Sequence, residues 1–239
     1  MAASLHQRVV DEVGRPIVDG TTVPGTVMLA DEIERHLGVS RSVVREAVRV
    51  LQSMGLVASI KHIGIRVQPS NRWNFYHPQV IRWRLEGVGR GGQLRAIVEV
   101  GSALEPIAAE LAARYGPREM ADELVRIAEQ MRSLNETADP AEYLELDTRY
   151  HRLVLHASGN EMFAMLDEAI AIVLLDPAAL TLVPNLQVTD EVVSWHLQAA
   201  RAIRGRNPVT ARRSMEHIIR RAFAELEEVW GEAPRQFFP

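Results

Sequence analysis

The last 140 or so residues constrain the fold most, because they repeat one helical pattern and carry no strand signal. Apolar residues recur every three or four positions, the spacing that places them on one face of a helix. Pro or Gly interrupts the pattern, and Pro directly after Asp or Asn signals a helix start. The predicted helices span residues 93–115, 117–134, 140–157, 160–182, 189–205 and 208–230. Such a series of amphipathic helices predicts an all-α bundle with its own core.

The composition is that of a globular protein without disulfides. A length of 239 residues allows one or two domains. Hydrophobic residues make up 47% and charged residues 24% of the chain, which are ordinary globular values. The absence of cysteine excludes disulfides, thiolate metal ligands and a cysteine nucleophile. The chain has neither a long apolar run nor a signal-peptide pattern, so we expect a cytoplasmic protein without membrane spans.

The net charge of −4 hides an uneven distribution of charge along the chain. Residues 1–40 carry a net charge of −3, residues 41–95 carry +8, and residues 96–239 carry −9. A basic stretch within an acidic protein indicates a local site for a polyanion such as DNA. Charge alone leaves chance clustering in an arginine-rich chain as an equal alternative.

The amino-terminal segment predicts a winged helix. Predicted helices span residues 5–20, 29–37 and 41–54, and predicted strands span 56–60 and 65–68. The first helical pattern is weak and ends near Gly14, whereas the other two are joined by a short turn, as in a helix-turn-helix. The strands form a hairpin around a basic turn. In a winged helix, the second helix of the helix-turn-helix enters the major groove and the hairpin reaches the adjacent backbone or minor groove.

The predicted helix at residues 41–54 has two distinct faces. Its apolar face consists of Val44, Ala47, Val48 and Leu51. Arg41, Arg45 and Arg49 are four residues apart and form a separate, outward stripe. Three like charges in one row repel each other and destabilise the helix. Phosphates or guanine edges facing the stripe would relieve that repulsion, so the stripe favours DNA as the partner.

The string Val39-Ser40-Arg41-Ser42-Val43-Val44-Arg45-Glu46-Ala47 resembles the DNA-binding domain of the GntR family of bacterial repressors. The resemblance implies DNA contacts from the second helix and from the wing. By position these contacts fall on Arg41, Ser42, Arg45, His62 and Gly64, with Arg35 and Arg49 as phosphate contacts and Lys61 in the same basic turn. The family wing usually has a second glycine, which this turn lacks.

A junction with a short helix, opened by Pro78 and running over residues 79–85, is predicted after the wing. The string Arg72-Trp73-Asn74-Phe75, followed by Pro78 and Trp83, resembles the linker of the D-galactonate-repressor-like branch of the FadR subfamily. The helix is expected to bury Ile81 and Leu85. In that branch an Asp commonly precedes the proline, whereas this chain has His77.

One carboxylate and three imidazoles form a possible metal site in the bundle. Asp147 and His151 are four residues apart on one predicted helix, so both side chains leave the same face. His196 and His217 lie at similar distances from the turn at Asn207, so antiparallel helices place them at similar height. These residue types bind divalent metals and leave positions for water or a ligand. From the residues alone, four isolated polar side chains remain the alternative.

Strings throughout the bundle resemble the FCD ligand-sensing domain of FadR-type GntR regulators. They are Glu105-Pro106, Leu146-Asp147, Tyr150-His151, Ser158-Gly159-Asn160 and the segment from His196 to His217. The resemblance implies a metal held by Asp147, His151, His196 and His217, with zinc expected and nickel or manganese as alternatives. The implied domains are a winged helix at 1–69, a linker at 70–92, an FCD domain at 93–232 and a tail at 233–239.

The effector site departs from the family pattern. Many FCD domains have an arginine after Glu-Val in the first long helix that helps bind the effector's carboxylate, whereas this chain has Glu99-Val100-Gly101. The metal would then hold the carboxylate, or other residues would help. The candidates for effector binding are Arg95, Arg149, Arg152 and Asn160. Gly101 would also leave room for a larger ligand.

These observations predict a ligand-responsive transcriptional regulator, most simply a repressor, and not an enzyme. Its expected partners are a pseudo-palindromic double-stranded operator, a second copy of the chain and a small organic acid such as a sugar acid, with no membrane. A metal-dependent hydrolase or lyase fused to a DNA-binding domain is one alternative, because Asp and His can hold a metal that activates water. A FadR-like sensor of fatty acyl thioesters is another, but it would not need the metal ligands.

Overall fold

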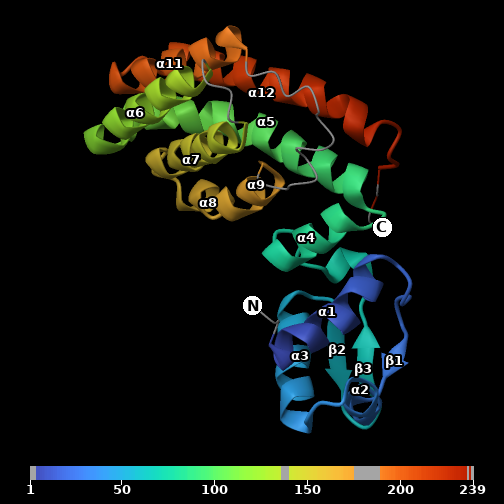
Figure 1. The fold of residues 1–239 in the computed structure, drawn as a ribbon. Helices are drawn as coiled ribbons and strands as arrows, with labels where there is room; N and C mark the ends of the chain where they lie inside the picture. The colour runs from blue at the N-terminus through green and yellow to red at the C-terminus, as the bar shows by residue number, and fades with distance from the viewer. Residues whose placement is uncertain (1–3, 136–139, 175–188, 236, 238–239) are drawn as a thin grey trace. The chain divides into compact units, whose positions relative to one another are not determined.

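The computed structural model describes residues 4–135, 140–174, 189–235 and 237 (Figure 1). The chain divides into two compact units, Met1–Arg90 with Gln236–Pro239, and Gly91–Arg235. The first unit contains a helix-turn-helix with a small sheet, and the second is helical throughout its described residues. The predicted fold class, a winged helix-turn-helix followed by an all-α bundle, is therefore confirmed.

The winged-helix unit has a three-stranded antiparallel sheet rather than a simple hairpin. Its elements are α1 (Leu5–Val18), β1 (Val27–Met28), α2 (Ala30–Leu37), α3 (Arg41–Ser53), β2 (Val57–Ile60) and β3 (Gly64–Val67). The strand order is β1-β3-β2, so β3 is the central strand. Its Ile65 pairs with Ser59 of β2 on one side and with Met28 of β1 on the other. The two-residue strand β1 was not predicted, because so short a segment shows no alternation of apolar and polar residues.

Helix α1 does not end near Gly14 as predicted but continues through Pro16 to Val18. The apolar stripe explains the difference, because Val13 is buried and Ile17, one turn later, is buried as well. This face of α1 packs against α3. Tertiary packing thus outweighs the low helix propensity of the glycine and the proline.

The segment after the wing packs onto the winged-helix core. Helix α4 (Pro78–Glu86) begins with Pro78 in its first turn, and the His77 Nδ1 accepts a hydrogen bond from the Gln79 backbone N–H at 3.2 Å. The predicted burial of Ile81 and Leu85 is confirmed. Trp83 is also fully buried, in the same hydrophobic cluster as the inner faces of α1 and α3. The compact unit that holds the winged helix therefore includes α4.

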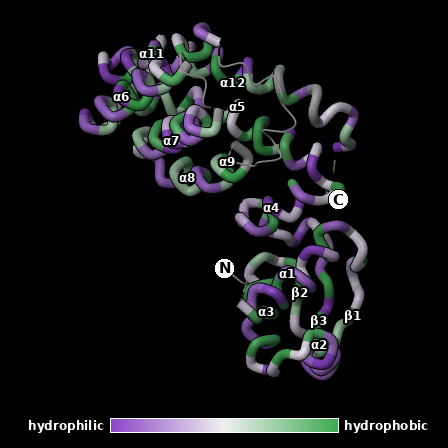
Figure 2. The backbone as a smooth tube through the Cα atoms, viewed as in Figure 1, coloured by the Kyte–Doolittle hydropathy of each residue, from purple (hydrophilic) through white to green (hydrophobic). Residues whose placement is uncertain are grey.

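The bundle follows the predicted helices closely. Its elements are α5 (Arg90–Tyr115), α6 (Arg118–Asn135), α7 (Pro140–Ala157), α8 (Glu161–Ala164), α9 (Asp167–Leu174), α11 (Asp190–Arg204) and α12 (Pro208–Trp230). Helix α11 packs on α6 and α12, α6 packs on α7, and α7 packs on α8 and α9. Hydrophilic and hydrophobic residues alternate along these helices, as amphipathic packing requires (Figure 2). No described helix has the length and apolar character needed to cross a membrane.

The predicted helix 160–182 is wrong as a single element. Its described part is two helices, α8 and α9, separated at Met165 and Leu166, and residues 175–188 lie outside the described residues. Asn160 caps α8 by accepting a hydrogen bond from the Met162 backbone N–H at 3.0 Å. The Asp167 carboxylate at the start of α9 accepts hydrogen bonds from Arg152 of α7. These bonds fix the first residue of α9 to α7, so α9 is a separate helix.

We predict that Gly14→Ala lowers the stability of the winged-helix unit. A Cβ at position 14 would lie 2.2 Å from Cη2 of the buried Trp83. Alanine normally stabilises a helix relative to glycine by roughly 1 kcal/mol. Overpacking against the indole reverses the sign, with an expected loss of about 2 kcal/mol in thermal or urea unfolding. Gly89→Ala is the matched control, because its nearest neighbours are 3.8 Å away. Equal stability of the two variants would contradict this packing.

Candidate DNA-binding surface and metal centre

The predicted recognition helix α3 presents its arginines to solvent. Val44, Ala47, Val48 and Leu51 are buried, whereas Arg41, Arg45 and Arg49 are exposed. Glu46 lies between the last two, with its Oε1 2.8 Å from Arg49 Nη1 and 3.7 Å from Arg45 Nε. Within the part of the chain that the structure describes, Arg41 makes no ion pair. The stripe therefore keeps most of its positive charge available to an anionic partner.

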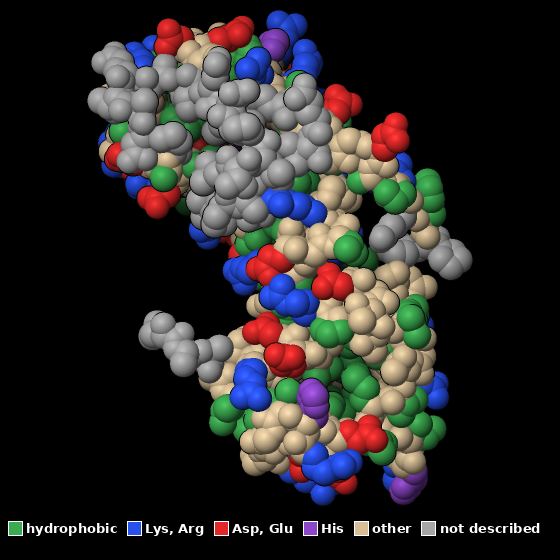
Figure 3. Space-filling model, turned by 45° about the vertical axis from the view of Figure 1, so that its right-hand side comes forward, with side chains coloured by type: hydrophobic (Ala, Val, Ile, Leu, Met, Phe, Trp, Pro, Cys, Tyr) green, Lys and Arg blue, Asp and Glu red, His purple; other side chains and the backbone are tan. Residues whose placement is uncertain are grey.

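Basic and polar groups also lie at the start of α3 and on the neighbouring helix. Ser42 is exposed, and its hydroxyl lies 2.9 Å from that of Ser40. Arg35 is exposed on α2, with its Nε hydrogen-bonded to the Asp31 carbonyl at 3.2 Å. Figure 3 shows Lys and Arg side chains with histidine at the lower end of the winged-helix unit in that view. The predicted phosphate contacts are thus accessible.

The wing turn places its polar side chains at the tip of the β2–β3 hairpin. Lys61 and His62 are both exposed. His62 has φ 63°, a left-handed conformation that non-glycine residues rarely adopt. Gly64 has φ 131°, and a Cβ there would lie 2.7 Å from the Met28 carbonyl oxygen of β1. Gly64 is therefore needed for sheet packing, and His62 occupies a left-handed position where a glycine would be unstrained. Arg66, exposed on β3, is a further basic residue of the wing that sequence reasoning missed.

In the bundle, Asp147, His151 and His196 meet as predicted. Each offers one ligand atom, and these atoms lie within 4.8 Å of one another. Asp147 Oδ1 is 3.7 Å from His151 Nε2 and 3.1 Å from His196 Nε2. Both imidazoles are buried and only 13% of the Asp147 side chain is exposed. Helix α7 supplies the first two side chains and α11 the third.

The His196 ring nitrogen that faces away from Asp147, Nδ1, is fixed by the backbone. Its Nδ1 lies 2.8 Å from the Val192 carbonyl oxygen, so Nδ1 carries the proton and donates it. In the neutral ring Nε2 then holds a bare lone pair. This buried nitrogen has no hydrogen-bond partner of acceptable geometry, although Asp147 Oδ1 is close. A lone pair facing a carboxylate is stabilised when a cation lies between them, which is the arrangement of a metal site.

His151 is held in the same way by a carboxylate. Its Nδ1 contacts Oε2 of Glu105, a buried residue of α5, which leaves Nε2 directed at Asp147. Burial lowers the pKa of His151, but Glu105 and Asp147 outweigh it and raise the pKa to about 9. Burial likewise raises the pKa of Asp147, yet the charge on His151 holds it below its usual value. Without metal, a proton on His151 thus balances the buried carboxylates, and a metal ion would displace it.

Tyr150 supports the second histidine from behind. Its hydroxyl donates a hydrogen bond to the His196 carbonyl oxygen at 2.9 Å, and its ring packs edge-on against the His196 ring with centroids 5.0 Å apart. Burial, Asp147 and Glu105 all raise the pKa of Tyr150, so the hydroxyl stays a donor. The three side chains therefore offer one oxygen and two nitrogens, a set that can hold a divalent metal and leave other coordination positions open.

His217 does not join this cluster. The predicted height is right, because His217 lies beside Trp195, the immediate neighbour of His196. Its face is different: the ring is exposed and stacks on the Trp195 indole, with centroids 5.3 Å apart and planes at 21°. Counting residues from a turn gives position along a helix axis but not rotation about it. Ser214, one turn earlier on α12, faces inward and bonds to Gln198 at 3.0 Å.

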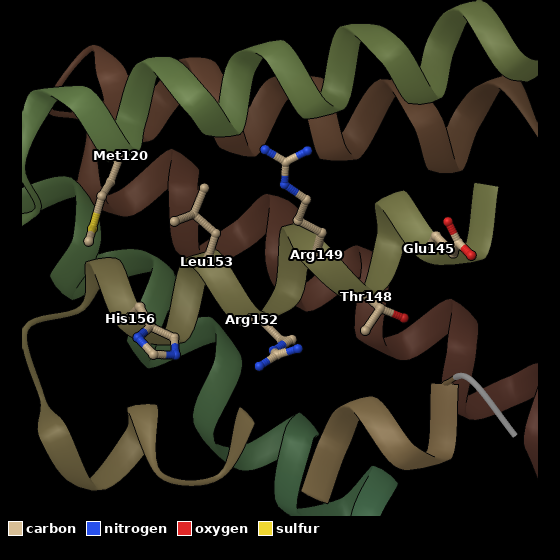
Figure 4. Close-up of a pocket in the computed structure, with 7 residues that line it drawn as sticks. All are labelled: Met120, Glu145, Thr148, Arg149, Arg152, Leu153 and His156. Atoms are coloured by element: carbon tan, nitrogen blue, oxygen red, sulfur yellow. The ribbon is translucent and has the colours of Figure 1, made fainter. Parts of the chain in front are cut away.

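The four residues predicted to bind the effector are not brought to the cluster. Arg95 donates to the Ala233 and Pro234 carbonyl oxygens, and Asn160 caps α8. Arg149 and Arg152 lie on the opposite face of α7, where they line a cleft of about 600 Å³ (Figure 4). There Arg149 pairs with Glu123 of α6, and Arg152 pairs with Asp167 of α9.

Glu105 and Tyr150 are site residues that the chemistry of the sequence did not reveal. A signal for Glu105 exists, because it lies in the buried stripe of α5 with Gly101, Ala108 and Ala112. A charged residue among small apolar ones is almost never fully buried unless it has a partner. That pattern predicts a buried partner but does not say which helix supplies it.

Comparison with known proteins agrees with both units. The family model described as "Bacterial regulatory proteins, gntR family" matches residues 5–67, and the "FCD domain" model matches residues 96–221. YieP, an HTH-type transcriptional regulator of Escherichia coli K12, is 30% identical over 151 residues, which are 63% of this chain and 66% of that protein. The galactonate operon transcriptional repressor of the same organism is 30% identical over 173 residues, 72% of this chain and 74% of the repressor.

The fold has counterparts among solved structures. The structure of Lar, which controls expression of the Listeria monocytogenes agr system, has a TM-score of 0.58 at 15% identity, covering 96% of this chain and 99% of that one. This likeness concerns the fold alone. The family models and the relatives are those of transcriptional regulators, which excludes the enzyme alternative. The chain belongs to the GntR family of bacterial regulatory proteins and is a DNA-binding transcriptional regulator of the FadR type with an FCD domain.

Proposed function

We propose that the protein is a homodimeric repressor that binds a pseudo-palindromic operator and changes its DNA affinity when a sugar acid binds a metal ion in the bundle. The observation that carries the proposal is the buried His196 Nε2, whose lone pair faces Asp147 Oδ1 at 3.1 Å with no hydrogen-bond partner. The exposed arginine stripe of α3 supplies the DNA-binding half. Dimerisation would present two recognition helices to the two half-sites of such an operator.

The proposed metal is a divalent ion of the first transition series. One carboxylate oxygen and two imidazole nitrogens suit zinc, and nickel or manganese are alternatives with the same donors. The second nitrogen of each ring is anchored, by Glu105 for His151 and by Val192 for His196, which fixes both rings with Nε2 facing Asp147. Water or effector oxygens would fill the remaining positions.

The proposed effector is an organic acid because a bound metal would be the attractive charge at this site. Asp147 and Glu105 carry two negative charges against the one proton on His151, so the metal-free cluster keeps a net negative charge and repels a carboxylate. A divalent ion would neutralise that charge and bind carboxylate and hydroxyl oxygens directly. The relative that represses a galactonate operon favours a sugar acid, which carries both groups.

Effector binding would have to favour one conformation of the regulator over another. A ligand shifts an equilibrium only by the difference between its affinities for the two states. The coupling free energy between effector and DNA is then reciprocal, so the operator also changes the affinity for the effector.

We expect Arg45→Ala to weaken specific operator binding by about tenfold or more, because a bidentate base contact contributes roughly 1–3 kcal/mol. An electrophoretic shift assay with the operator of the protein, against a scrambled competitor at fixed salt, measures the loss. Arg118→Ala, at an exposed arginine of the bundle, is the control and should bind as the wild type does. Unchanged specific binding by the Arg45 variant would rule out α3 as the recognition helix.

Purified protein is expected to contain about one divalent metal per chain, measured by elemental analysis. His196→Ala removes a ligand and should abolish stoichiometric binding, whereas His217→Ala should retain it because that ring stacks on Trp195. Loss of metal in both variants would instead indicate that His217 is a fourth metal ligand, as the sequence predicted. The absence of metal from the wild type after zinc, nickel and manganese loading would refute the metal centre.

A thermal-shift screen is expected to identify aldonic acids as ligands of the metal-loaded protein. A ligand at a hundred times its Kd stabilises the folded state by about 2.7 kcal/mol, which raises the melting temperature by several degrees. The shift should disappear after chelation, because the acid then meets only carboxylates and histidines. Equal shifts with and without metal would place the acid elsewhere, and the cleft beside Arg149 and Arg152 would be the next site to test.

A further inference from the structure

Glu105 and Gly101 form a matched pair on α5 that the established family membership does not assign. They are one helical turn apart, and both are buried. A Cβ built at Gly101 would lie 2.9 Å from Glu105 Oε1, closer than side-chain atoms normally approach. The glycine therefore provides the space that the Glu105 carboxylate occupies in this conformation.

The second oxygen of the Glu105 carboxylate, Oε2, contacts His151, one of the proposed metal ligands. Glu105 Oε2 contacts His151 Nδ1, and His151 Nε2 faces Asp147. A carboxylate can only accept hydrogen bonds when ionised, so its presence fixes the proton on Nδ1 and leaves Nε2 as the ligand nitrogen. The negative charge also makes the imidazole a stronger donor to a metal. His196 is held by a neutral carbonyl instead, so the two histidines are not equivalent.

A glycine at this position is otherwise a poor choice. Gly101 lies in the middle of a 26-residue helix and has a helical conformation, with no positive φ that would require glycine. Glycine in a helix interior is less stable than alanine. Its contact at 2.9 Å is with the end of a flexible side chain rather than with backbone, so a methyl group could be accepted if Glu105 moved. In this chain the close contact at position 101 therefore involves the Glu105 carboxylate and not the backbone of a neighbouring helix.

We propose that Glu105 is a positioning residue for the metal, acting through His151, and that in this chain the Glu105 carboxylate reaches that histidine by using the space beside Gly101, where many FCD domains carry an arginine. The inference rests on the proposed metal site, because Glu105 touches no metal itself. Its consequence is that metal affinity and helix stability respond in opposite directions to substitution at residue 101.

The test measures zinc affinity by competition with a chromophoric chelator in the full-length protein, together with the melting temperature after metal removal. Gly101→Ala should weaken zinc binding by about tenfold while leaving the melting temperature of the metal-free protein equal or higher, because alanine favours the helix. Glu105→Gln keeps the shape and an acceptor oxygen but loses the charge, and should weaken zinc binding about ten- to hundredfold. Glu110→Gln, at a half-buried residue of the same helix that pairs with Arg114 and Arg212, should bind zinc as the wild type does.

A second readout separates positioning from general structural damage. The visible absorption spectrum of bound Co²⁺ reports ligand geometry, and long-range ¹H–¹⁵N spectra report which nitrogen of His151 carries the proton. We expect both to change in Glu105→Ala and the proton on His151 Nδ1 to persist in Glu105→Gln.

The outcomes are distinct for the two proposals. If the wild type binds zinc and the Gly101→Ala and Glu105→Gln variants bind it equally tightly, the positioning role is wrong and the metal centre stands. If zinc affinity falls only in parallel with a falling metal-free melting temperature, the role is structural and the inference is wrong. If the wild type binds none of the metals, both proposals fail together.

Discussion

The interaction on which the bundle site depends is the pairing of two largely buried carboxylates, Glu105 and Asp147, with the histidines around them. Isolating ionised carboxylates from water is strongly unfavourable unless positive charge and hydrogen bonds surround them. Glu105 and Asp147 satisfy this condition by sharing His151, whose Nδ1 contacts Glu105 and whose Nε2 lies 3.7 Å from Asp147 Oδ1. The raised pKa of His151 is the electrostatic expression of the same requirement. A core built only for stability would place apolar residues here, so the cluster is a candidate site for a cation.

The rest of the bundle holds that cluster together from three helices. Helix α7 contributes Asp147 and His151 one turn apart, α5 contributes the supporting carboxylate, and α11 contributes His196 with its backbone anchor. Tyr150, on the same face of α7, ties the two histidine-bearing helices together through the His196 carbonyl. Because each ring is fixed at its second nitrogen, the ligand atoms are held in place before any metal arrives.

Periodicity predicted most of the fold, because helices and caps are written in local residue patterns. The Asn207-Pro208 start of α12 and the apolar faces of α3 and α7 are examples. Contacts across helices were less accessible. The matched heights of His196 and His217 followed from the short connection, but the rotation of α12 depends on the packing of Ser214 and Trp195. At position 101 the sequence shows only that the arginine of many FCD domains is replaced by glycine. The structure adds that the space beside this glycine is occupied by the Glu105 carboxylate.

Three ligands suit a sensor better than four. A tetrahedral site filled by protein has no position left for a small molecule, as in structural zinc sites, whereas three protein ligands leave at least one position for water or substrate. With His217 stacked on Trp195, Asp147, His151 and His196 form such an open set. A metal held in this way keeps residual positive charge, because only Asp147 among its direct ligands is anionic. An acid that replaces bound water there gains both the charge and the coordination bond, so in the proposed function the incomplete ligand set is what makes the metal a receptor for the effector.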